Sequence, residues 1–164
     1  MKKLLAVLLL CVSASVFAQQ SAEQVKKALI RSWDLVSSTI TSKEGVVIQG
    51  TTGEKPLARA TFLTNGQYFL VNTRNDLPKF ASGNRMTGTA EESKAIVTRS
   101  VAHYGTYTIS ADGKDLVLKA IGSTWQPWVG VEQRRPITIN SDQYVTKAGA
   151  SSSGTTEQKW RRVK

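Results

Sequence analysis

The stretch from Leu57 to Thr73, LARATFLTNGQYFLVNT, decides the fold of this chain. Apolar and polar residues alternate on both sides of Asn65-Gly66, and a period of two is typical of β-strands that bury one face. The Asn-Gly pair tolerates the positive φ angles of a tight turn, so the stretch predicts a hairpin with strands at 57–64 and 67–73. The core of the fold is therefore expected to be an antiparallel sheet.

The same alternation recurs along most of the chain. It predicts further strands at about 33–41, 45–49, 103–110, 115–121, 131–139, 143–148 and 155–163. Asp112-Gly113 predicts the turn between two of them, and Gly149 to Gly154 reads as a flexible stretch before the last strand. Nine strands of this length suit an antiparallel barrel, and the fold class is all-β.

Two capping-box spacings predict two helices. Ser21 to Gln24 opens a short N-terminal helix with Val25 and Leu29 on one face, and Thr89 to Glu92 opens a midchain helix of about a dozen residues that ends at Ala102. Two interpretations of the segment 74–102 stay open. Its loop and helix cover one mouth of the barrel, or the helix lies on the surface and links two halves of the chain.

Composition bounds the class of protein. A chain of 164 residues with 40% hydrophobic residues predicts one domain with a core rather than a disordered polymer. The 22 Lys and Arg against 12 Asp and Glu give a net charge of +10, which is compatible with an anionic partner. One cysteine, Cys11, and one histidine, His103, exclude zinc fingers, disulfide scaffolds and Cys/His catalytic pairs.

The N-terminus has the pattern of a secretory signal. Lys2 and Lys3 precede an apolar run from Leu4 to Val12, and Val16-Phe17-Ala18 offers the residues that a signal peptidase needs. We expect a signal peptide at 1–18, which would carry Cys11 away, and an exported domain at 19–164, either periplasmic or secreted. The alternative is a membrane anchor, but the apolar run is short for about 30 Å of hydrocarbon.

Several segments carry a family resemblance. They are Ser32 to Ser37 (SWDLVS), Asn65-Gly66, Pro78 to Ala81 (PKFA), Gly88 to Glu92 (GTAEE), Tyr104 to Tyr107 (YGTY) and Trp128 to Arg135 (WVGVEQRR). In order and spacing, over about residues 31–163, the chain resembles the bacterial lipocalin-like domain family. The resemblance implies a calycin-type antiparallel barrel with an internal cavity, and it implies no known activity. Many members have a histidine where this chain has Lys119 and Ala120, so chemistry that depends on that histidine is not expected here.

Alternation over 131–139 directs two polar side chains inward. Val131, Ile137 and Ile139 share their face with Gln133 and Arg135, and an inward arginine needs partners because an unpaired buried charge is very costly. One interpretation is that Gln133 and Arg135 orient the polar or anionic head of a ligand. The other is a structural arginine, tied to backbone carbonyls or stacked on Trp33 to close the barrel bottom.

Aromatic residues supply the rest of the predicted cavity, while the small side chains of Ala58 and Ala60 leave volume inside it. Trp125 and Trp128 lie in a loop and either rim an opening or plug it. The candidate ligand-binding residues are Trp33, Phe62, Tyr68, Tyr104, Trp128, Gln133 and Arg135.

The search for catalytic chemistry is negative. The sequence has no nucleophile elbow, phosphate loop, dinucleotide fingerprint or metal-ligand cluster, so we predict no catalytic residue, metal or cofactor. His103 is expected to be structural or solvent-facing rather than catalytic. Glu91 and Glu92 suit the first turn of a helix, where carboxylates interact favourably with free amides, although general acid–base work by the pair is an alternative.

Three hypotheses for function follow. The first is an exported, non-enzymatic carrier or sensor of a small, largely hydrophobic or amphipathic ligand held in a barrel cavity. The alternative is a cavity enzyme of the cyclase or isomerase type, which folds a hydrophobic substrate around Arg135, Tyr104 and a carboxylate. The third is a filled barrel that acts through its surface.

The basic residues near the C-terminus leave a further question open. They are Lys147, Lys159, Arg161, Arg162 and Lys164. They form a solvated face or meet an anionic envelope surface of lipid or cell-wall polymer. A nucleic-acid partner is not expected, because Trp160 is the one aromatic residue close to them.

Overall fold

The computed structural model describes residues 20–50, 52–151 and 154–164, and within them it contains nine strands and two α-helices. The helices are α1 (Ala22–Leu29) and α2 (Ala90–Arg99). The strands are β1 (Ser32–Thr41), β2 (Val47–Gln49), β3 (Pro56–Phe62), β4 (Gln67–Arg74), β5 (Val101–Ile109), β6 (Asp115–Ser123), β7 (Glu132–Ile139), β8 (Gln143–Ser151) and β9 (Gly154–Arg162). The predicted signal peptide at 1–18 lies outside the described residues.

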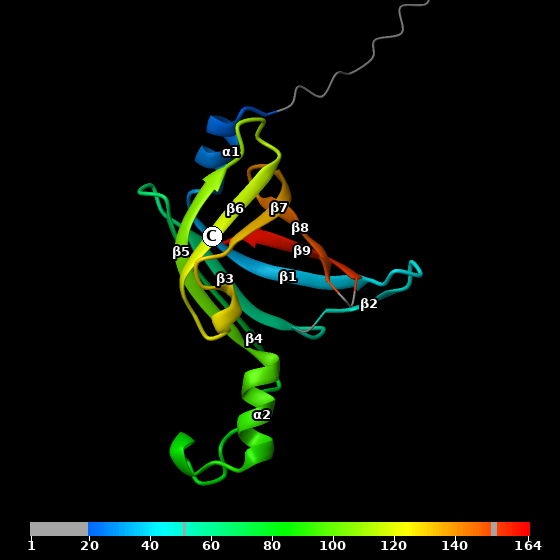
Figure 1. The fold of residues 1–164 in the computed structure, drawn as a ribbon, viewed down its shortest axis with the longest axis vertical. Coiled ribbons are helices and arrows are strands. Elements are labelled where there is room, and N and C mark those ends of the chain that lie inside the picture. Colours follow the sequence, from blue (N-terminus) through cyan, green and yellow to red (C-terminus); the bar gives the residue numbers. More distant parts are fainter. Residues whose placement is uncertain (1–19, 51, 152–153) are drawn as a thin grey trace, which may run out of the picture.

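The sheet closes on itself. Neighbouring strands pair antiparallel in the order β2-β1-β3-β4-β5-β6-β7-β8-β9, and β9 pairs back onto β1 from Trp33↔Arg162 to Thr41↔Thr155. Eight strands therefore form the barrel, while β2 extends it by pairing with the end of β1 (Figure 1). The predicted all-β antiparallel barrel is confirmed.

The hairpin that decides the fold has the predicted pairing but a longer turn. β3 ends at Phe62 rather than Thr64, and Leu63 to Gly66 make the turn, with the Leu63 amide donating to the Gln67 carbonyl at 2.9 Å. Only Gly66 of the Asn-Gly pair has a positive φ, +81°. The side chain of Asn65 instead accepts a hydrogen bond from the amide of Gln67, a local turn contact that asparagine favours.

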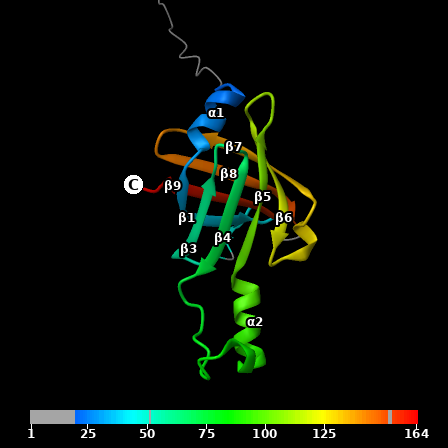
Figure 2. The ribbon, with the colours of Figure 1, turned by 90° about the vertical axis from the view of Figure 1, so that its left-hand side faces the viewer.

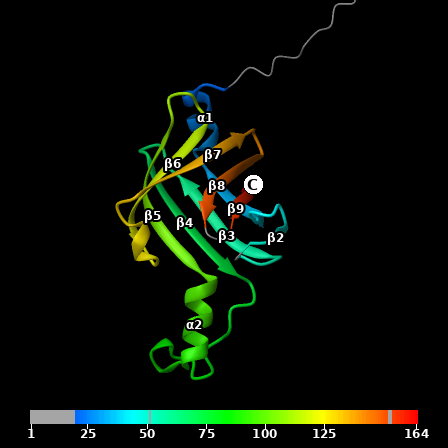
Figure 3. The same ribbon diagram turned by 45° about the vertical axis from the view of Figure 1, so that its right-hand side comes forward.

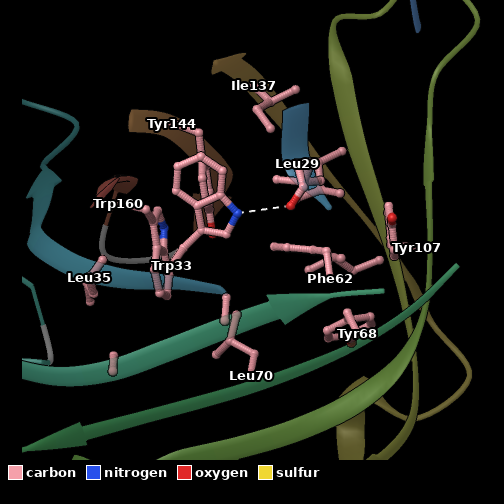
Figure 4. Close-up of a cluster of buried hydrophobic side chains, with 14 of the residues drawn as sticks. Leu29, Trp33, Leu35, Phe62, Tyr68, Leu70, Tyr107, Ile137, Tyr144 and Trp160 are labelled. Atoms are coloured by element: carbon pink, nitrogen blue, oxygen red, sulfur yellow. Dashed lines mark hydrogen bonds between the residues drawn. The ribbon is translucent and has the colours of Figure 1, made fainter. Parts of the chain in front are cut away.

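Helix α1 closes one end of the barrel. Its predicted capping box is present, with Ser21 and Gln24 each accepting a hydrogen bond from the other's backbone amide. The helix buries Val25 and Leu29, and the indole Nε1 of Trp33 donates to the Leu29 carbonyl at 3.0 Å (Figure 4).

Aromatic rings fill the half of the barrel next to α1. The rings of Trp33 and Tyr144 meet edge to face at 4.9 Å, Tyr144 stacks on Trp160 at 5.5 Å, and Phe62 meets Tyr107 at 5.0 Å (Figure 4). The small side chain of Ala60, predicted to leave volume, is fully buried opposite Trp33 in the β1–β3 register. This end is a packed core rather than a cavity.

The midchain helix projects away from the barrel at the end opposite α1 (Figures 1, 2 and 3). Its capping box at Thr89 and Glu92 is as predicted, but it ends at Arg99, before the predicted Ala102. Ser100 is already extended, and the chain enters β5 at Val101 because that residue begins the pairing with β4. No residue of α2 is buried, so the helix borders the barrel mouth without covering it.

Two smaller features complete the fold. β8 continues to Ser151, which pairs with Gly154, so part of the stretch predicted to be flexible is strand. Residues 152 and 153 lie outside the described residues.

Among the residues that the structure describes, no helix is long and apolar enough to cross a membrane.

Candidate ligand-binding site

Strand β7 carries polar side chains into the barrel beyond the packed aromatic floor. Its residues alternate as predicted from Glu132 onward: Glu132, Arg134 and Pro136 are exposed, whereas Gln133 and Arg135 are partly buried on the same face as Ile137. Val131, predicted to face inward, precedes the strand and is exposed. Both inward polar residues keep some accessible surface.

Arg135 is the charged group of this interior. Its Nη2 donates to Gln133 Oε1 at 2.7 Å, and among the described residues no carboxylate lies within 4 Å of the guanidinium. The hydroxyl groups of Tyr68 and Tyr144 interact with it electrostatically. Burial lowers the pKa of Arg135 from its ordinary value, but a guanidinium starts high enough to stay charged.

A hydrogen-bonded pair from two neighbouring strands lies near enough to Arg135 to feel its charge. The Tyr68 hydroxyl on β4 lies 2.8 Å from Nδ1 of His103 on β5, and His103 is only 4% exposed. Burial, together with the charge of Arg135, lowers the pKa of His103 to about 4, so the imidazole is neutral at neutral pH. Burial raises the pKa of Tyr68 to about 12, so its hydroxyl keeps its proton.

These residues make one group, which we call the inner polar cluster: Tyr68, His103, Gln133, Arg135 and Tyr144. It combines one cation with neutral hydrogen-bonding groups. Such a group can bind and orient a polar atom. In the described part of the chain, no carboxylate lies within 4 Å of the arginine to act as a base beside it.

Several buried polar atoms in the described residues have no hydrogen-bond partner. They are Thr52 Oγ1, Asn72 Oδ1, Gln133 Nε2 and Trp160 Nε1. Each unpaired buried polar group costs about 1–3 kcal/mol, so a bound molecule that pairs with them recovers that free energy. Gln133 belongs to the inner polar cluster, and the ring of Trp160 stacks on Tyr144 of the same cluster.

Thr52 and Asn72 instead line a pocket at the barrel mouth. The pocket has a volume of about 470 Å³, and its other walls are the end of α2 with the start of β5 (Val97 to Val101), Trp125 and Trp128. We call it the mouth pocket. Its lining is mainly apolar, with two unpaired oxygens at the side of the barrel interior.

Trp128 joins the mouth pocket to the inner polar cluster. Its ring meets the ring of His103 edge to face at 5.2 Å. A short 3₁₀ helix, Gln126–Trp128, holds it, and the amide of Gly130 ties the loop to β6 by donating to the Ala120 carbonyl at 2.9 Å. Both loop tryptophans, Trp125 and Trp128, therefore line the mouth pocket.

The seven predicted site residues fall into four places, of which the outer face holds Tyr104 alone. Tyr68, Gln133 and Arg135 belong to the inner polar cluster, and Trp128 lies in the wall beside it. Trp33 and Phe62 belong to the packed floor.

Tyr104 is a correction, because it lies on the outer face of the barrel. It is 49% exposed and stacks on Phe69 at 6.0 Å. Alternation in β5 turns His103, Gly105 and Tyr107 inward and leaves Tyr104 outside. The enzyme hypothesis needs Tyr104 beside Arg135. The structure does not bring these two residues together, because Tyr104 points outward.

The structural interpretation of Arg135 is also corrected in one respect. The guanidinium over Trp33 is that of Arg31, 5.7 Å from the ring centroid, and in the described residues no ring contact joins Trp33 to Arg135. Trp33 lies at the floor under α1, where its indole is held by Leu29. Arg135 lies above that floor and contacts Gln133 instead.

Sequence reasoning missed four residues of the site: Thr52, Asn72, His103 and Tyr144. His103 could have been found, since it shares the phase of Tyr107 and Ile109 in its strand. Within the described residues no group of three His, Cys, Asp or Glu side chains could hold a metal ion.

The basic residues near the C-terminus are all exposed, whereas strand alternation alone would expose about half of them. Lys147 and Lys159 lie 3.8 and 3.6 Å from the carboxylate of Glu157, so part of that charge is offset locally.

The described chain forms an eight-stranded antiparallel barrel with one packed end, a pocket at the other end and polar groups between them. The chain belongs to the lipocalin-like domain family, whose model matches residues 31–163, and the resemblance seen in the sequence is confirmed. A comparison with curated proteins gives no match.

Two solved structures are similar to this chain. A redesigned β barrel is 12% identical with a TM-score of 0.43, and the match covers 85% of this chain and 96% of that one. A de novo designed fluorescence-activating β barrel is 10% identical with a TM-score of 0.43, and the match covers 85% of this chain and 97% of that one.

Proposed function

We propose that this protein binds a small, largely hydrophobic ligand in its barrel, without catalysis, and that the ligand enters through the mouth pocket. The mouth pocket of about 470 Å³ carries the proposal, because it is mainly apolar and leads to buried polar atoms that lack partners. Apolar walls with a few convergent polar groups are typical of small-molecule sites. Membership of the lipocalin-like domain family supports the same conclusion.

Titration with a neutral, environment-sensitive apolar dye tests the proposal. We expect saturation at one site per chain in the unmodified protein. Thr98→Trp should weaken binding about tenfold or more, because Thr98 is exposed in the pocket wall and an indole would fill the space. The melting midpoint should stay unchanged, since the side chain is on the surface of α2.

Ser93→Trp is the matched control. Ser93 is exposed on the same helix but does not line the pocket, so this variant should bind the dye as the unmodified protein does. Absent or non-saturable dye binding, or equal binding by the Thr98 and Ser93 variants, would show that the mouth pocket is not the entrance.

We also propose export of the domain after cleavage behind Ala18, on the pattern of Lys2, Lys3 and the apolar run that follows. Mass spectrometry of the protein recovered from the periplasm or the medium should give a chain that starts at Gln19. A mass that retains Met1 to Ala18 would contradict it.

A further inference from the structure

The inner polar cluster carries a positive charge without a counter-ion in the described residues. Arg135 has no carboxylate within 4 Å, and Tyr68, Tyr144, His103 and Gln133 add no negative charge, since burial keeps both tyrosines protonated by raising their pKa. A buried charge without a partner is unfavourable, so an anion that reaches Arg135 gains both a charge pair and hydrogen bonds.

The hydrogen-bond donors of the cluster come from two side chains. Arginine has only donors, so its contact with Gln133 fixes the amide oxygen toward the guanidinium and turns Nε2 away from it. That Nε2 is buried and unpaired. Because the guanidinium has further N–H groups, Arg135 and Gln133 each offer a hydrogen-bond donor to a guest.

The charge balance selects the kind of anion. A carboxylate carries one negative charge and matches the planar guanidinium in geometry. A phosphate monoester carries close to two charges at neutral pH, and the single cation of the cluster would leave the second uncompensated in a buried place. The mouth pocket, lined by Trp125, Trp128 and Val97, suits the apolar remainder of the same molecule.

We propose that the ligand is an amphiphilic carboxylic acid that enters head first, with its carboxylate on Arg135 and Gln133 and its apolar chain in the mouth pocket. This inference rests on the proposed function and names the chemical class of its ligand. Trp128 lies between the two parts, in contact with His103 of the cluster and in the wall of the pocket.

Displacement of the neutral dye by two matched amphiphiles tests the inference. Dodecanoate and dodecanol have the same chain length and differ in the charge of the head. The unmodified protein should bind dodecanoate at least about tenfold more tightly than dodecanol, because a hydrogen bond to a charged group is the stronger one.

Two variants locate the preference. Arg135→Met should remove it by lowering the affinity for dodecanoate about tenfold or more, with dodecanol and dye affinities changed less than about threefold. Arg134→Met, on the exposed face of the same strand, is the control and should keep the preference.

The outcomes separate the two proposals. If the dye binds and dodecanol displaces it as readily as dodecanoate or more readily, the proposed carboxylate site is wrong. The proposed binding of a hydrophobic ligand is then unaffected. Loss of the preference in the Arg134 variant also overturns it. Failure of the dye itself to bind contradicts the proposed function. If Arg135→Met does not fold, the comparison of the two amphiphiles on the unmodified protein still decides.

Discussion

At the scale of residues, few contacts hold the side chain of Arg135 inside the barrel. The guanidinium of Arg135 has a single hydrogen-bond partner among the described residues, the side chain of Gln133 two positions away on the same strand. An arginine that closes a barrel would be held by several acceptors, and removing it would strand them. We therefore expect Arg135 to serve a bound molecule more than it serves the fold.

This view predicts the effect of Arg135→Met on stability. The free energy of unfolding without ligand should stay within about 1 kcal/mol of the unmodified value or rise, since replacing a buried, unpaired charge with an apolar side chain is often neutral or stabilising. Urea denaturation measures it, with Arg134→Met as the outward-facing control. A loss of about 3–5 kcal/mol would instead mark Arg135 as a structural residue.

His103 gives the barrel a pH-dependent stability. Its pKa is about 4 in the folded state, below the ordinary value of 6.5 expected after unfolding, so the unfolded chain takes up the proton more readily between these values. The contribution of the neutral imidazole is therefore complete above pH 6.5 and is lost as the pH falls toward 4. The loss amounts to at most about 3 kcal/mol.

Denaturation of the unmodified protein and of His103→Gln at about pH 7.5 and about pH 4.5 tests this effect. The unmodified protein should lose about 2–3 kcal/mol more than the variant over that interval. The surface carboxylates titrate in both proteins and cancel in the comparison. Equal losses would show that His103 is not held neutral by its surroundings.

At the scale of elements, the sequence predicts most of the strands because each strand has its own local pattern. Alternation and the turns at Gly66 and Gly113 depend on neighbouring residues, and all nine predicted strands are present. The end of α2 was missed because pairing of Val101 with Asn72 on β4, a tertiary contact, overrides the helical pattern.

The sequence was a weaker guide to which side chains of a strand point into the barrel. Tyr104 was chosen for its aromatic ring, although alternation with Tyr107 and Ile109 places His103 inside and Tyr104 outside. Whether a buried polar atom finds a partner depends on residues far apart in the chain. The unpaired state of Gln133 Nε2 and Thr52 Oγ1 therefore could not be predicted from the sequence.

Strand β5 also shows why one glycine is required. A Cβ on Gly105 would clash with the Lys119 carbonyl oxygen of β6, where the register shifts between Tyr104 and Gly105. Gly105→Ala should therefore lower the free energy of unfolding by roughly 1–3 kcal/mol, the usual effect of overpacking. Thr106→Ala, on the exposed face beside it, should cost less than about 1 kcal/mol in the same urea titration. Equal losses would contradict this account of the close strand contact.

At the scale of the whole molecule, the two ends of the barrel differ: one is a packed core and the other carries a pocket. The end under α1 is packed with aromatic rings around Trp33 and supplies stability. The other end carries the mouth pocket, the loop of Trp128 and the exposed helix α2. For the ligand that we propose, the packed floor leaves the mouth as the way in, and we expect the ligand to stop at the inner polar cluster.

The four tryptophans of the chain report on this division directly. Their indole N–H groups give separate signals in a ¹H–¹⁵N NMR spectrum, and they sit at different depths. Trp125 and Trp128 line the mouth pocket, the Nε1 of Trp160 is buried without a partner, and that of Trp33 is bound to Leu29 at the floor.

Titration of the ¹⁵N-labelled protein with dodecanoate is thus the most direct test of the central claim that a ligand enters the mouth and reaches the inner polar cluster. The indole signals of Trp128 and Trp160 should shift together and saturate at one equivalent, while the signal of Trp33 stays in place. Shifts confined to Trp125, or no saturable shift at Trp160, would show that the molecule binds only at the surface and would contradict the claim.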